Sequence, residues 1–102
     1  MFSLAQFKHW LARHADSKIV VTTYSPEHFT IDCLMSGRKI PAADKRLQPL
    51  IFTSPQAVKQ KLAEYEMNVI YLDYDAAFEG EHDIDKQLWA EGLLVMRFTP
   101  GE

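Results

Sequence analysis

The sequence has few of the residues that build covalent cross-links or tight ligand loops. Cys33 is the only cysteine among 102 residues, so no disulfide can form within the chain, which fits a reducing compartment. The four glycines, at positions 37, 80, 92 and 101, are too scattered for the G-x-G-x-x-G or P-loop phosphate motifs. No apolar run approaches the roughly 20 residues of a membrane-spanning helix. A disulfide scaffold, the common nucleotide-binding motifs and a helical membrane span are therefore not expected.

Strong net charge is lacking too. The formal net charge of −3 gives no overall field that would attract nucleic acid or an anionic membrane. The first residues lack a basic stretch followed by an apolar one, so no signal peptide is predicted. With 47% hydrophobic and 25% charged residues, the composition is that of an ordinary globular domain. We expect a single soluble, cytoplasmic domain over residues 1–102, without membrane or nucleic-acid partners.

Two segments carry the signals of amphipathic helices. Ser3 and Gln6 have the S-x-x-Q spacing of a capping box, which predicts a helix over residues 3–14. Ser54 is a good N-cap residue and Pro55 suits the first helical position, so a second helix is predicted to begin there. The expected apolar stripes are Leu4, Phe7, Trp10 and Leu11 in the first helix, and Val58, Leu62 and Tyr65 in the second.

Five segments have the composition of strands. Residues 18–24 are rich in β-branched side chains and residues 28–35 alternate between apolar and polar, which together predict a hairpin. Residues 49–53 and 67–72 flank the second helix and predict a parallel strand–helix–strand crossover. The second of these strands is apolar throughout, which favours burial on both faces. Residues 93–98 are predicted to be the last strand.

These segments predict the fold class. Residues 36–48 are expected to be a loop, and residues 84–91 fit either a short helix or an extended segment. The expected order is α-β-β-β-α-β-(α)-β. We therefore predict an α+β two-layer domain, in which a mixed, mostly antiparallel sheet of about five strands carries its helices on one face.

Charge is segregated into two parts of the chain. Residues 38–46, here called the basic loop, contain four cations against the single acid Asp44. Residues 73–85, the acidic segment, contain six acids and no lysine or arginine, and without those six the formal charge of −3 would become +3. The opposite charges predict a non-catalytic interaction or accessory module that binds a protein partner or a second copy of itself. The expected contact residues are Arg38, Lys39, Lys45 and Arg46.

A divalent-metal site is the alternative interpretation of the acidic segment, because hard cations prefer carboxylate oxygens. The candidate ligands are Asp73, Asp75, Glu79, Glu81, His82, Asp83 and Asp85. The EF-hand pattern is not met, since Ala77 and Phe78 occupy its fifth and sixth positions. A solvated acidic surface explains the same residues without a metal, and no bound cofactor is expected.

No pattern of residues indicates a catalytic centre, so enzyme activity is not expected. His9 and His14 are five residues apart and do not share one helix face, as zinc ligands would. Ordinary surface positions are predicted for all four histidines. Cys33 lies on the apolar side of its strand, where burial raises the pKa of a thiol and suppresses its reactivity. A site assembled by folding from residues without a motif is the third interpretation.

A series of turn and cap residues recurs in one group of proteins. The series consists of a hairpin ending at Gly37, then Pro41, Asp44, Pro49-Leu50, Phe52, a helix start at Ser54 with Ala57 and Leu62, an apolar strand, and an acidic–aromatic loop reaching Gly80. With these features the chain resembles a family of short uncharacterised bacterial domains of unknown function. It departs from their pattern at Gln48, where a glycine is usual, and in the loop between Asp75 and Gly80. The resemblance implies a fold and no activity.

Overall fold

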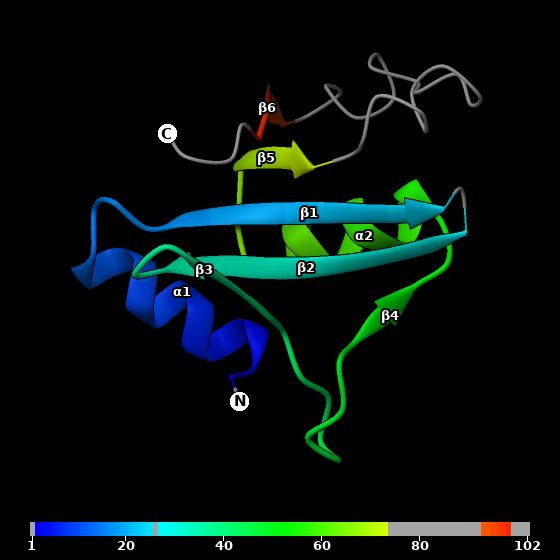
Figure 1. Cartoon of the computed structure of the whole chain (residues 1–102), viewed down its shortest axis with the longest axis horizontal. Helices are drawn as coiled ribbons and strands as arrows, with labels where there is room; N and C mark the ends of the chain where they lie inside the picture. Colours follow the sequence, from blue (N-terminus) through cyan, green and yellow to red (C-terminus); the bar gives the residue numbers. More distant parts are fainter. Residues whose placement is uncertain (1, 26, 74–92, 99–102) are drawn as a thin grey trace.

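Two helices lie on one face of a six-stranded mixed sheet, which confirms the predicted α+β two-layer fold (Figure 1). This computed structural model describes residues 2–25, 27–73 and 93–98. The elements, in chain order, are α1 (Leu4–Arg13), β1 (Lys18–Ser25), β2 (His28–Met35), β3 (Arg38–Pro41), β4 (Ile51–Phe52), α2 (Pro55–Glu64), β5 (Val69–Asp73) and β6 (Leu94–Arg97). No helix within the described ranges is long and apolar enough to cross a membrane.

The sheet has the order β3-β2-β1-β5-β6, and β4 pairs with the other end of β2. Strands β1, β2 and β3 form an antiparallel meander, whereas β1, β5 and β6 run parallel to one another. The predicted hairpin of β1 and β2 is therefore confirmed and lies at the centre of the sheet.

Both helices begin at the predicted caps. The Ser3 hydroxyl accepts from the Gln6 backbone N–H at 3.2 Å, and the Gln6 side chain accepts from the Ser3 N–H at 2.8 Å, which completes the capping box. The Ser54 hydroxyl accepts from the Ala57 N–H at 3.2 Å and starts α2. These bonds satisfy backbone donors that have no partner inside a helix.

The core lies between the helices and one side of the sheet. Alternation along each strand sends every second side chain to this side. Val58 and Leu62 of α2 are fully buried, as predicted, and Tyr65 is half-buried against the same cluster. The other buried members are Leu4, Phe7, Ile19, Val21, Phe29, Ile31, Cys33, Met35, Ala42, Phe52, Met67, Ile70 and Leu72.

Three sequence predictions of strands need correction. Residues 38–41, expected in a loop, form β3, because Ser36 and Gly37 take φ values of 51° and 80° and make a two-residue hairpin turn. Strand β4 is only two residues long, shorter than the predicted 49–53; it runs parallel to β5 in the same sheet, as predicted, with β2 and β1 between them. Val69 in β5 is 48% exposed, so this strand is not buried on both faces along its whole length. The prediction for residues 84–91 lies outside the described residues.

The packing of α1 on the sheet is testable at Phe7, which is fully buried. Phe7→Ala should destabilise the protein by about 3–5 kcal/mol, because it removes a large apolar side chain and leaves a cavity. The measurement is urea unfolding followed by circular dichroism. The exposed neighbour Lys8 is the control, and Lys8→Ala should change stability by no more than about 0.5 kcal/mol. Equal effects of the two substitutions would contradict the observation that α1 buries the face with Phe7 and exposes the face with Lys8.

Candidate functional site

The cations of the basic loop are placed in two separate positions by the structure. Arg38 and Lys39 belong to β3, whereas Lys45 and Arg46 lie in the connection to β4, which projects away from the sheet (Figure 1). The side chains of Lys45 and Arg46 are exposed and form no ion pair within the described part of the chain. The predicted contact residues therefore do not form a single patch.

Residues 44–48 form an ordered turn that is organised by Asp44. Its carboxylate accepts from the backbone N–H groups of Arg46 at 2.8 Å and Gln48 at 3.1 Å. The Asp44 N–H donates to the Gln48 carbonyl oxygen at 2.9 Å, and its own carbonyl accepts from the Leu47 N–H at 3.1 Å. An aspartate that binds nearby backbone groups in this way fixes a turn. We call residues 44–48 the recognition turn.

Leu47 is the most unusual residue of the recognition turn. Its side chain is 64% exposed and its φ is 62°, in the left-handed region that disfavours side chains with a Cβ. An exposed leucine adds nothing to the core, and its backbone conformation costs stability. Backbone strain of this kind is concentrated at binding and catalytic sites.

The N-terminus runs beside the base of the recognition turn. Phe2 and Ala42 form a parallel bridge, and the Phe2 carbonyl accepts from the Ala43 N–H at 2.8 Å. A second bridge joins Ala43 to Pro49 and closes the base of the connection. These contacts hold the turn at a fixed place relative to α1.

Lys39 and Asp73 form an ion pair across the open face of the sheet, the face opposite to the helices. The Lys39 ammonium also donates to the Thr22 hydroxyl at 3.2 Å and lies 5.6 Å from the centre of the Phe98 ring. Asp73 lies on β5, where it pairs with Thr22 of β1. The Lys39 side chain therefore extends from edge strand β3 over β2 and β1 to reach it. The predicted basic and acidic segments thus meet at this pair inside one chain.

Asp32 lies buried next to this ion pair. It is 2% exposed, accepts a hydrogen bond from the Thr22 hydroxyl and leaves its other carboxylate oxygen, Oδ1, without a partner in the described residues. The hydroxyl of Thr30, on the same face, is also buried and unpaired there. Burial raises the pKa of Asp32. The hydroxyls of Thr22 and Thr30 and the charge of Lys39 oppose the rise, and the charge of Asp73 adds to it. Buried at 2% and 7%, Asp32 and Thr22 offer little surface to a substrate.

Of the predicted metal ligands, only Asp73 is placed by the structure, and Lys39 occupies its carboxylate. The predicted ligands at positions 75, 79, 81, 82, 83 and 85 lie outside the described residues. Within residues 2–25, 27–73 and 93–98, no three side chains of histidine, cysteine, aspartate or glutamate are close enough to hold a metal ion. The metal site therefore stays a prediction.

The histidines and the cysteine are placed largely as predicted. His9 and His28 are exposed, whereas His14 is half-buried against Trp10. Cys33 is fully buried, and burial raises the pKa of its thiol to about 11. The predicted unreactive environment of Cys33 is therefore confirmed.

Sequence reasoning missed the roles of Thr22, Asp32 and Leu47. Asp32 stands among apolar side chains on an alternating strand, and its polar neighbours come from β1 and β3, so the cluster depends on strand register. Leu47 resembles any loop leucine in sequence, and only its φ and its exposure distinguish it.

Comparison with known proteins gave no match, whether to a protein-family model, to a curated protein or to a solved structure. The resemblance to the family of short bacterial domains stays a prediction.

The raised pKa of Asp32 gives stability a defined pH dependence. The folded state holds the Asp32 proton more tightly than the unfolded state. The protonated carboxyl therefore adds to the free energy of unfolding at low pH, and this stabilisation is lost as pH rises through the folded pKa. Asp32→Asn has no proton to lose and can still accept from Thr22. Urea unfolding between about pH 4 and pH 8 should show the variant gaining stability relative to the wild type as pH rises. A difference that is constant with pH, or that falls, would contradict this account.

The reactivity of Cys33 should report unfolding. With its pKa near 11 and its side chain fully buried, the thiol should react with a thiol reagent at pH 8 only when the protein opens. The labelling rate should rise with urea concentration up to that of the unfolded chain, which serves as the reference. Labelling of the folded protein at the unfolded rate, without urea, would show that the thiol is accessible.

Proposed function

We propose that this chain is a small, non-catalytic interaction module that associates with a second copy of itself through the acidic segment and the recognition turn. The carrying observation is that the hydrogen bonds of Asp44 hold Leu47 exposed on an ordered turn, with Lys45 and Arg46 exposed beside it. An apolar side chain flanked by unpaired cations suits a contact in which charge steers the encounter and the leucine is buried.

The non-catalytic part of the proposal is supported by the positions of the reactive side chains. The Cys33 thiol faces the core, and the Thr22 hydroxyl and Asp32 carboxylate are almost completely buried. The Lys39 ammonium is bound by Asp73 and Thr22. These groups therefore act as parts of the fold, in which Lys39 ties edge strand β3 to the parallel half of the sheet.

The metal-dependent alternative has less support. Asp73 begins the acidic segment, and an ammonium group already occupies its carboxylate. A divalent cation at Asp73 would have to displace Lys39 or take its ligands from the remaining acids. We therefore favour the interaction module over a metal-dependent protein.

Charge reversal in the recognition turn tests the proposal. Sedimentation at about 0.05 M salt should show association of the wild-type chain that weakens by about 0.5 M, because salt screens exposed charges. Lys45→Glu combined with Arg46→Glu should abolish the association, since both side chains are exposed and lie on the projecting turn.

The control reverses two cations of α2. Lys59→Glu combined with Lys61→Glu changes the net charge of the chain equally and should leave association unchanged. A monomer under all conditions, association that is insensitive to salt, or equal loss in both double variants would each contradict the proposed function.

A further inference from the structure

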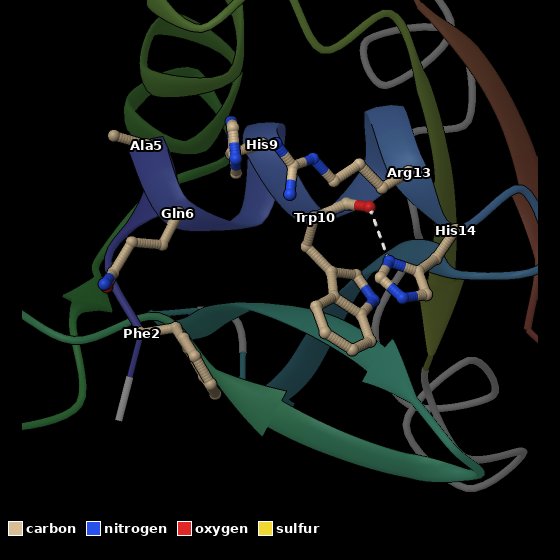
Figure 2. A pocket seen from close by; sticks show the side chains of 7 residues that line it. All are labelled: Phe2, Ala5, Gln6, His9, Trp10, Arg13 and His14. Carbon is tan, nitrogen blue, oxygen red and sulfur yellow. Dashed lines mark hydrogen bonds between the residues drawn. The ribbon is translucent and has the colours of Figure 1, made fainter.

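The exposed side of α1 carries a shallow groove with a volume of about 420 Å³. Such a volume lies within the range of pockets that hold small ligands or side chains. Figure 2 shows the rings of Phe2 and Trp10 on the same side of the helix, with His9 and Arg13 along the other rim. The lining residues are Phe2, Ala5, Gln6, His9, Trp10, Arg13 and His14.

Trp10 and His14 form a fixed aromatic platform at one end of the groove. Their rings are stacked, with centroids 3.6 Å apart and planes within 9° of each other. The indole N–H of Trp10 donates to the Ser17 hydroxyl at 2.7 Å, and His14 Nδ1–H donates to the Trp10 carbonyl oxygen at 3.1 Å, the bond drawn in Figure 2. Because both rings are already held in place, a ligand that packs on them would not bear the cost of ordering them.

The rim of the groove carries the cation Arg13, and none of the lining residues is acidic. Helix α1 contains no aspartate or glutamate, and the first acid of the chain is Asp16. Arg13 is exposed and forms no ion pair within residues 2–25, 27–73 and 93–98. An aromatic floor next to an unpaired guanidinium suits a ligand that carries an apolar ring and a carboxylate close together.

The acidic segment has this chemistry. Tyr74 lies between two aspartates, and Phe78 is followed directly by Glu79. Each aromatic residue of the segment is therefore adjacent to a carboxylate. The segment is complementary in charge and in apolar character to a groove that the same chain presents.

We propose that the α1 groove binds the acidic segment of a second copy of the chain. An aromatic side chain of the segment packs on the Trp10–His14 platform, and its neighbouring carboxylates lie beside Arg13 and His9. Phe2 lines the groove, and its carbonyl oxygen accepts a hydrogen bond from Ala43 at the base of the recognition turn. One segment can therefore contact both the groove and the recognition turn. This inference rests on the proposed function and names the segment that the module recognises.

The test uses the full chain and a capped synthetic peptide with the sequence of residues 73–85. Titration calorimetry at low salt should show binding that weakens as salt is added. A peptide in which Tyr74 and Phe78 are replaced by alanine should bind at least about tenfold more weakly, because the aromatic anchors are gone. A peptide with its acids replaced by their amides should lose the salt dependence.

Protein variants locate the binding site. Ala5 and Arg13 line the groove and are exposed, so Ala5→Glu and Arg13→Glu should lower peptide affinity at least about tenfold while the fold is retained. Ala12→Glu is the matched control for Ala5→Glu, because it adds the same single charge to an exposed position of α1 outside the groove. Thermal unfolding by circular dichroism checks that each variant is folded.

The outcomes separate this inference from the proposed function. If Lys45→Glu with Arg46→Glu abolishes salt-sensitive association while Ala5→Glu and Arg13→Glu leave peptide affinity unchanged, the groove is not the binding site and the interaction module stands. Equal losses in Ala5→Glu and Ala12→Glu also overturn the groove assignment. A chain that stays monomeric at all concentrations overturns the second-copy assignment and the proposed function together.

Discussion

The alternation of side chains along the central hairpin is the constraint on which the structure depends. It sends Ile19, Val21, Ile31 and Cys33 into the helix layer, where they meet Phe7 and Leu62. Burying this apolar surface is the main favourable contribution to folding. Within the described residues, helices cover one face of the sheet, and the opposite face carries polar side chains such as Asp32 and Lys39. The same packing also fixes the outer side of α1 toward solvent.

The face opposite to α1 and α2 carries a network of charged and polar side chains. Lys39 crosses from the edge strand to Asp73, and Thr22 links this pair to buried Asp32. Removing one partner of such a network leaves a poorly solvated charge, so these residues are expected to matter for holding β3 and β5 against the central hairpin of β1 and β2. The segregated charges in the sequence thus serve the fold in part.

Local signals predicted the elements well, and long-range placement was where prediction failed. The caps at Ser3 and Ser54 depend on near neighbours, and the structure contains both. The alternation of β2 correctly predicted the strand and its core face, but Thr30 and Asp32 on its other face are buried too, so the strand is not half-buried as predicted. The position of β4 and the exposure of Val69 depend on which strands become neighbours, which a single sequence does not encode locally. The candidate site follows the same rule in part: the cations were visible in the sequence, whereas the groove needs Phe2 to be placed beside α1 by its bridge to Ala42. The φ of Leu47 is fixed by local hydrogen bonds of Asp44, which the residue types alone did not indicate.

The central claim is that one continuous surface, from the Trp10–His14 platform through Phe2 to the recognition turn, is built for an acidic partner segment. Nuclear magnetic resonance of the isotope-labelled chain, titrated with the unlabelled peptide of residues 73–85, tests this claim most directly. The account predicts that shifted backbone resonances cluster at residues 2–14 and 43–48. Shifts confined to the open face of β1 and β2, or no shifts at all, would contradict it.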